Sequence, residues 1–306
     1  MIDYGFLQEQ NVSAGLIADV KTFAEKHAVL DSDKGRLCQP VIPYFGREIL
    51  EMAISALLQG ENLLLSGSKA TGKNVLAENL AYIFGRPIYN VSFHVNTDSF
   101  ALIGADTFKD NEVTLRSGPV SLCALGGGFG ILDEINMAKN EAVSVLHATL
   151  DQRRIIDIPG YDKIELHPAC RFIGTMNYGY AGTRDLNEAL VSRFLVIDMP
   201  PIDEVTLRKI ISYSVPDISP MAAEQFGGLF MDLQKKAENG EISTKPVDLR
   251  GMLAAIRTMR HGVSPVLAIK MGITNKSFDN FEKELVSDIV ATRIPDAWTK
   301  NDIFEG

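Results

Sequence analysis

The sequence predicts an α/β protein in which a parallel sheet, covered on both faces by helices, is followed by a smaller helical region. Between residues 47 and 200, short apolar runs typical of buried strands alternate with segments of helical periodicity. This alternation is typical of a parallel sheet, because parallel strands must be joined by crossovers, which are usually helices. After Pro200 and Pro201 the strand-like runs end, and helical sequence of mixed charge follows.

Residues 1–46, 47–200 and 201–306 are expected to form three successive regions. The first combines helical periodicity over 12–27 with an extended, proline-containing linker over 38–45. The other two contain the remaining elements. We expect strands at 63–65, 88–92, 129–133, 172–176 and 195–198, hairpins at 107–115 and 154–166, and helices at 48–58, 74–84, 140–151, 205–212, 221–239, 248–261 and 280–290.

Composition narrows the class of protein. The chain has 306 residues, of which 46% are apolar and 23% charged, ordinary values for a globular protein. Its formal net charge of −9 disfavours a protein that binds the nucleic-acid backbone, which would need a basic face. Its three cysteines contain no C-x-x-C pair and predict reduced thiols. With no signal-like N-terminus and no long apolar stretch, we expect a cytoplasmic protein without a membrane span.

One motif dominates the sequence. An apolar run enters a glycine-rich loop, the loop closes on a lysine, and a helical pattern follows, which is the context of a nucleotide-binding P-loop. Its residues are Gly67, Ser68, Lys69, Ala70, Thr71, Gly72 and Lys73, followed by Asn74. Glycines let the backbone N–H groups surround a phosphate, and the helix N-terminus favours the same anion. Lys73 would bring a full positive charge to the outer phosphates.

Polar residues also end three later segments of the predicted core. The strand 129–133 ends in Asp133 and Glu134, which suit nucleotide hydrolysis: Asp133 would hold Mg²⁺, and Glu134 would orient and activate water. The strand 172–176 is followed by Asn177, which would lie between these carboxylates and the terminal phosphate, because parallel strand ends share one edge. Arg193 ends a helix-like stretch and could stabilise charge on a transferring phosphoryl group.

In this order the four segments resemble the AAA+ ATPases, and more narrowly the MoxR branch, which includes the CbbQ/NorQ-type activators. The stretches 132–138 and 174–190 carry the narrower resemblance. The resemblance implies a P-loop AAA+ core with a five-stranded sheet in the order 5-1-4-3-2, and a small α-helical lid. It also implies site roles: Gly67 to Lys73 as Walker A, Asp133 and Glu134 as Walker B, Asn177 as sensor 1, and Arg193 as the arginine finger that reaches a neighbouring subunit.

The lid would supply one more site residue. Asp248 could cap a helix that holds Arg250 in its first turn, and Arg250 then resembles sensor 2. Lys245 is the rival candidate, because relatives often place the arginine there.

Two residues depart from the family pattern, which normally has glycine at position 70 and Thr or Ser at position 74. A left-handed conformation at Ala70 would cost about 1 kcal/mol. Asn74 can offer a carbonyl oxygen, a legitimate magnesium ligand, although its reach differs from that of a hydroxyl. We therefore expect ATP and Mg²⁺ to bind, whereas the rate of hydrolysis is in question.

The resemblance implies an ATP-driven remodelling machine: a ring, expected to be hexameric, that acts on a protein client. A von Willebrand factor A domain partner would be a separate chain, because no D-x-S-x-S motif occurs here. One alternative is an assembly module that binds ATP and barely hydrolyses it, as Ala70 and Asn74 suggest. Another is a nucleic-acid restriction motor, which the acidic charge and the sequence Asn177-Tyr178-Gly179 disfavour.

Overall fold

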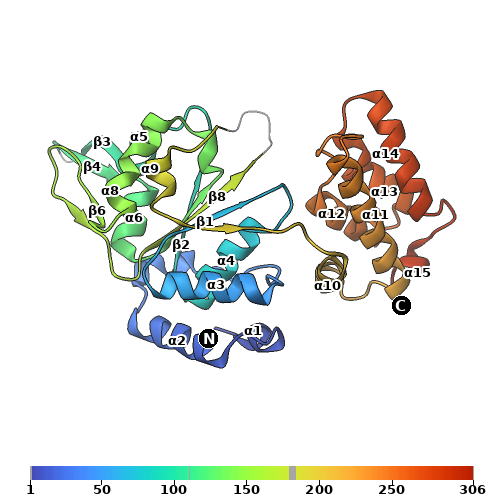
Figure 1. Cartoon of the computed structure of the whole chain (residues 1–306), viewed down its shortest axis with the longest axis horizontal. Helices are drawn as coiled ribbons and strands as arrows, with labels where there is room; N and C mark the ends of the chain where they lie inside the picture. Colours follow the sequence, from blue (N-terminus) through green and yellow to red (C-terminus); the bar gives the residue numbers. More distant parts are fainter. Residues whose placement is uncertain (1, 110, 179–183, 306) are drawn as a thin grey trace. The chain divides into compact units, whose positions relative to one another are not determined.

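The computed structural model describes residues 2–109, 111–178 and 184–305. The chain divides into two compact units, Met1–Pro200 and Pro201–Gly306. Each unit has its own helices, and only the first contains the parallel sheet (Figure 1). Within the described residues, no helix is long and apolar enough to cross a membrane.

The sheet of the first unit has five parallel strands in the order β2-β5-β8-β1-β9. They are β1 (Leu63–Gly67), β2 (Ile88–Ser92), β5 (Phe129–Asp133), β8 (Arg171–Asn177) and β9 (Leu195–Asp198). When only these strands are numbered along the chain, the order reads 5-1-4-3-2 from β9 to β2, as the family resemblance implied. The labels β3, β4, β6 and β7 belong to strands of two hairpins outside this sheet. The sheet and its helices confirm the predicted α/β fold.

Alternate residues of the strands point to opposite faces of the sheet, and each face packs in its own hydrophobic core. Leu63 and Leu65 of β1 pack in one core with α3 (Arg47–Leu58) and α4 (Lys73–Ile83). Leu64 of the same strand packs in the other. Helices lie on both faces in Figure 1, as a parallel sheet requires.

The helices of the second core are short. They are α5 (Ser99–Ile103), α6 (Pro119–Gly126), α7 (Asn140–Val143), α8 (His147–Leu150) and α9 (Glu188–Val191). The single helix expected over 140–151 is divided, because a 3-10 turn at Ser144–Leu146 separates α7 from α8.

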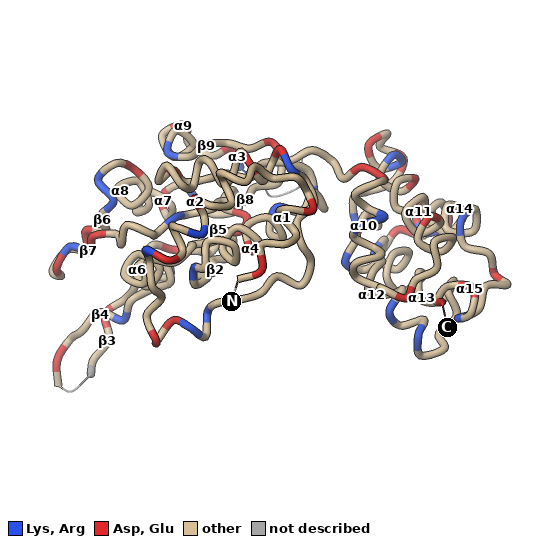
Figure 2. Tube along the Cα trace, turned by 90° about the horizontal axis from the view of Figure 1, so that it is seen from below, with Lys and Arg blue, Asp and Glu red and all other residues tan. Residues whose placement is uncertain are grey.

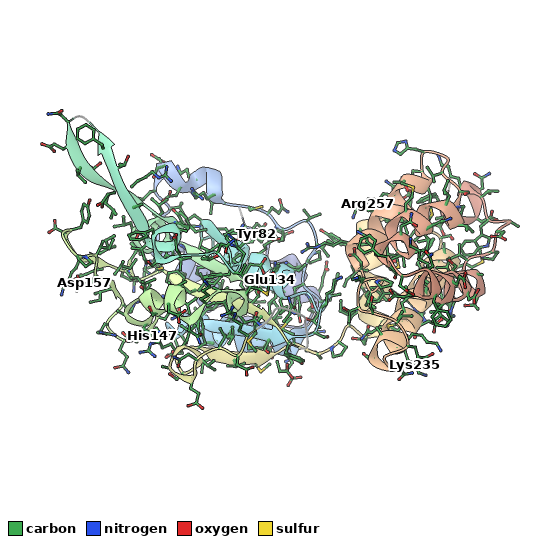
Figure 3. All side chains as sticks on the ribbon, turned by 90° about the horizontal axis from the view of Figure 1, so that it is seen from above. Tyr82, Glu134, His147, Asp157, Lys235 and Arg257 are labelled. Carbon is green, nitrogen blue, oxygen red and sulfur yellow. The ribbon has the colours of Figure 1, made fainter. Side chains whose placement is uncertain are left out.

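Both expected hairpins form. The first, β3 (Gly104–Lys109) with β4 (Glu112–Ser117), projects from the sheet (Figure 2). The second pairs only two residues on each side, β6 (Ile155–Ile156) and β7 (Ile164–Glu165), and an ion pair of 3.2 Å joins Lys163 to Asp157, which is labelled in Figure 3.

The N-terminal residues pack on the first unit through α1 (Gly5–Glu9), α2 (Ala14–Lys26) and the 3-10 turn η1 (Asp31–Arg36). Leu7 and Val20 enter the core that contains α3 and α4. Arg86 is 1% exposed and ties this region to α6, since its guanidinium donates to the carbonyl oxygens of His27, Gly126 and Gly127.

The second unit is helical, as predicted. It contains α10 (Glu204–Ser214), α11 (Pro220–Glu238), α12 (Leu249–Met259), α13 (Pro265–Gly272), η4 (Thr274–Lys276), α14 (Asn280–Arg293) and α15 (Lys300–Ile303). The sequence pattern had not indicated α13 or α15. Trp298 packs edge-on against Phe226 of α11 and so fixes the C-terminal segment to this unit. Basic and acidic positions are interspersed along the described trace of both units (Figure 2).

Candidate functional site

The predicted phosphate loop connects β1 to α4 at the carboxyl edge of the sheet. All five residues of β1 are buried, so the strand fixes the start of the loop. Gly67 is required where it stands, because a Cβ there would lie 2.8 Å from the carbonyl oxygen of Met199. Thr71 folds the loop back by donating from its hydroxyl to the carbonyl of Ser68 at 3.1 Å.

Two loop residues have left-handed backbone conformations, Ala70 with φ of 66° and Gly72 with φ of 84°. Glycine accepts this conformation freely, whereas alanine loses about 1 kcal/mol. The loop therefore keeps the shape that glycine would favour at position 70, at a local cost. Gly72 is the N-cap of α4, which directs the N-terminus of that helix at the loop.

Lys73 lies inside the loop and is 7% exposed. Its ammonium donates to the carbonyl oxygens of Gly67 at 3.0 Å and Ser68 at 2.6 Å, and to the Thr71 hydroxyl at 3.2 Å. Burial lowers the pKa of Lys73 from 10.5 to about 8, although Asp133 and Glu134 oppose this shift. A cation is thus held at the centre of the loop with little water around it.

The linker before α3 closes one side of the loop through Tyr44. Its buried ring packs beside Gly72, where a Cβ would meet ring carbon Cε2 at 3.4 Å. Asn79 of α4, fully buried, accepts from the Tyr44 N–H at 3.1 Å and donates to the Ile42 carbonyl at 3.0 Å. Gln10 completes the clamp, since its amide donates to the Tyr44 carbonyl and accepts from the Gly46 N–H, both at 2.8 Å.

The acidic pair and Asn177 meet at the neighbouring strand ends. The Asn177 amide donates to Oε1 of Glu134 at 3.2 Å, and Glu134 lies at the end of β5 (Figure 3). Asn177 also pairs in register with Gly67, where the loop leaves β1. The fold therefore brings the loop, Glu134 and Asn177 to one edge, as the strand pattern predicted. Asp133 is half-buried at the same edge.

Arg193 follows α9 and has partners of its own within the first unit. Its guanidinium donates to the carbonyl of His147 (labelled in Figure 3) at 3.0 Å and to that of Ala189, and it lies 3.6 Å from the carboxylate of Asp151. These contacts hold it beside α8, and none of them is with Lys73, Asp133 or Glu134.

Arg250 and Lys245 belong to the second unit. Asp248 caps α12 by accepting from the Gly251 N–H at 3.1 Å, which leaves exposed Arg250 in the first turn, as predicted. The Lys245 ammonium lies 5.2 Å from the ring centre of Phe278.

Comparison with known proteins assigns the chain to a family. A model of the AAA domain, dynein-related subfamily, matches residues 62–194, which include the loop, both carboxylates, Asn177 and Arg193. The uncharacterized protein YojN of Bacillus subtilis is 34% identical over 249 residues, which cover 80% of this chain and 82% of YojN. The chain belongs to the AAA+ family.

Another relative is the uncharacterized Staphylococcus aureus protein SAB1265c, which is 34% identical over 237 residues, or 75% of this chain and 89% of that protein. A crystal structure of "a putative ATPase" from Cytophaga hutchinsonii aligns with 92% of this chain and 87% of its own, at 17% identity and a TM-score of 0.47. The stretch 174–190, which carried the narrower MoxR resemblance, includes residues 179–183, which lie outside the described part of the chain.

The donors at this AAA+ site fit a magnesium nucleotide. The loop, with left-handed conformations at Ala70 and Gly72, and the start of α4 offer backbone N–H groups to phosphate, and Lys73 adds a positive charge. Half-buried Asp133 and Asn74 carry the oxygen atoms that Mg²⁺ prefers. No group of three or more His, Cys, Asp or Glu among the described residues could hold a metal, and magnesium in nucleotide sites usually needs only one or two carboxylates besides phosphate.

Sequence reasoning missed two residues that hold this site together. Thr175, 1% exposed, donates from Oγ1 to Oδ1 of Asp133 at 2.7 Å. Asn136 donates from its amide to the Asn177 carbonyl at 2.8 Å. The period of two along a strand could have revealed Thr175, because it shares a strand face with Asn177. Nothing in the local pattern of residues 135–137 marks Asn136 as a partner of Asn177.

Proposed function

We propose that this AAA+ chain binds ATP with Mg²⁺ at the loop 67–74 and hydrolyses it to remodel a protein client, as MoxR-type ATPases do. One observation carries the proposal: Gly67, at the start of the loop, is in register with Asn177, whose amide donates to Glu134 at 3.2 Å. The proposal is supported because the buried Lys73 ammonium and the Glu134 carboxylate lie near the ends of β1 and β5, with β8 between them, and nucleotide hydrolysis needs a cation for phosphate and a carboxylate for water at one site.

Each site residue has a distinct role in this proposal. Lys73 and the loop amides bind the phosphates, Asp133 and Asn74 hold the metal, Glu134 accepts the proton of the attacking water, and Asn177 orients Glu134. Bound Mg²⁺ would neutralise the charge that develops on the phosphate oxygens. We assign sensor 2 to Arg250 rather than Lys245, because the Lys245 ammonium already packs on Phe278.

We further propose that the chain works in the cytoplasm as a homo-oligomeric ring, with six subunits, and with a separate von Willebrand factor A domain partner. In that ring Arg193 acts on the nucleotide of a neighbouring subunit. Among the described residues, the partners of its guanidinium are Asp151, His147 and Ala189, all outside the loop 67–74, which supports action in trans.

Glu134→Gln tests the proposal. The amide still fits the site but cannot accept a proton, so we expect nucleotide affinity to persist while turnover falls about 100-fold or more. Fluorescent-nucleotide titration and steady-state phosphate release measure the two quantities. Retained turnover would remove Glu134 from its role, and failure of the wild-type protein to bind ATP would overturn the proposed site.

The alternative function, ATP-dependent assembly with little hydrolysis, is favoured by Asn74 at the position of the usual hydroxyl and by the strained Ala70. Asn74→Thr separates the two. If Asn74 is only a poor metal ligand, the threonine variant should hydrolyse ATP faster and need less Mg²⁺. An unchanged magnesium titration would show that position 74 does not touch the metal. Nucleotide-dependent assembly with negligible turnover in both proteins would favour the alternative.

A further inference from the structure

Thr175 joins the two carboxylate residues of the site through a single hydroxyl. It belongs to β8, next to the end of β5 in the register that pairs Leu132 with Gly174. Its Oγ1 lies 2.7 Å from Oδ1 of Asp133 and accepts from the backbone N–H of Glu134 at 3.1 Å. Thr175 is 1% exposed, so water cannot readily replace either bond.

These two bonds fix the direction of the hydroxyl proton. Because the Glu134 N–H can only donate, it occupies an acceptor position on Oγ1. Asp133 presents an acceptor oxygen when ionised, and the hydroxyl proton therefore points at Oδ1. One oxygen of Asp133 is thus anchored toward β8.

The backbone bond has a second consequence. Glu134 has φ of 55°, a left-handed conformation that is unfavourable for a residue with a Cβ. The hydrogen bond from its N–H to Thr175 supports that conformation, and Asn177, two residues further along the same face of β8, holds the Glu134 carboxylate. Thr175 and Asn177 therefore support Glu134 at the backbone and at the side chain, respectively.

We propose that Thr175 is a positioning residue for ATP hydrolysis, which fixes the Asp133 carboxylate and the backbone of Glu134 so that the metal ligand and the general base keep their mutual geometry. This inference rests on the proposed function. It predicts that loss of the hydroxyl reduces turnover while nucleotide affinity is retained, since Thr175 pairs with Leu65 of β1 and its hydroxyl bonds to Asp133 and Glu134.

Thr175→Val tests this, because valine keeps the shape and removes both bonds. We expect turnover to fall about tenfold or more, as loss of one to two hydrogen bonds implies, with the nucleotide dissociation constant changed less than about twofold on the same scale. The magnesium concentration for half-maximal activity should rise. In the nucleotide-free protein, the Glu134 amide should exchange hydrogen faster. Thr175→Ser, which retains the hydroxyl, should restore all three properties.

Thr149→Val is the matched control. Thr149 is also fully buried in the first unit, but its hydroxyl donates to the Ile155 carbonyl, away from the carboxylates. It should leave turnover and Glu134 exchange unchanged. Equal losses in both valine variants, or unchanged turnover in Thr175→Val, would overturn the inference. If the wild-type protein binds ATP but does not hydrolyse it, the proposed function fails. The role of Thr175 is then still decided by comparing wild type and Thr175→Val in two measurements: hydrogen exchange of the Glu134 amide and the magnesium dependence of nucleotide affinity.

Discussion

Lys73 is a buried residue with a positively charged side chain, so its protonation state should affect both nucleotide binding and stability. The residue is 7% exposed, and burial lowers the pKa of its amino group to about 8. Removing the ammonium should abolish ATP binding, because it is the charge enclosed by the loop. The same burial destabilises the nucleotide-free protein at neutral pH, since the charged form must be desolvated.

The lowered pKa predicts a pH dependence of nucleotide affinity. The ammonium is charged below about pH 8 and loses its proton above it, whereas an unperturbed lysine stays charged to about 10.5. ATP affinity should therefore be highest below pH 8 and decline between pH 8 and 10, as titrations with a fluorescent nucleotide can measure. Lys73→Arg is the control, because a guanidinium stays charged throughout. A wild-type affinity that is flat to pH 10 would contradict the shift.

The linker of residues 38–45 is the element that couples the N-terminal helices to the phosphate loop. Gln10 holds it from one side and Asn79 of α4 from the other, and Tyr44 between them packs beside Gly72. Deep burial also raises the pKa of Tyr44 to about 12, so the phenol stays neutral at physiological pH. The linker is thus braced by neutral hydrogen bonds and packing.

Gln10→Ala should weaken the attachment of the linker to the N-terminal helices. It removes two hydrogen bonds of 2.8 Å, which contribute about 0.5–1.5 kcal/mol each to the free energy of unfolding, and it should weaken ATP binding several-fold while kcat at saturation is kept. Isothermal titration and urea unfolding check the two effects. Gln8→Ala, at an exposed position on α1, the helix that Gln10 caps, should change neither. Equal behaviour of the two variants would show that the brace does not reach the loop.

Strands proved easier to predict than short helices. The bounds predicted for β2, β5 and β9 are those observed, because buried strands of a parallel sheet are continuous apolar runs ended by polar residues. In contrast, α6 and α13 were missed. In α6 the exposed positions within the helix include Leu122 and Leu125, so the helix lacks the polar face that reveals helical periodicity. The left-handed conformation at Ala70 was considered from the sequence, because the family pattern has glycine there. The hydrogen bonds of Thr175 could not be predicted, because they depend on the register between β5 and β8.

For the chain as a whole, the decisive question is whether a site is completed by a second copy. The sequence predicted where each strand lies, whereas the sheet order came from family resemblance. Local patterns could not show that Arg193 contacts Asp151 and His147, because that depends on how α8 and α9 pack.

Arg193→Ala should leave ATP binding intact in each subunit and strongly reduce turnover. Mixing it with Lys73→Ala protein should restore part of the activity, because some interfaces then combine an intact loop with an intact arginine. Phosphate release measured over a range of mixing ratios tests this. Arg153→Ala is the control, since Arg153 also pairs with Asp151, at 2.7 Å, but lies on an exposed turn. Absence of rescue in rings whose mixed composition is verified by mass would count against a shared site.

The buried guanidinium of Arg86 determines where this protein can be divided. The family match begins at residue 62, yet one of the three carbonyl partners of Arg86 belongs to His27. A fragment beginning at residue 47 would leave that charge short of a partner in a low-dielectric interior and would uncover the core that Leu7 and Val20 fill. We therefore expect that the segment matching the family model does not fold by itself, because residues of the N-terminal helices fill part of the interior of the first unit.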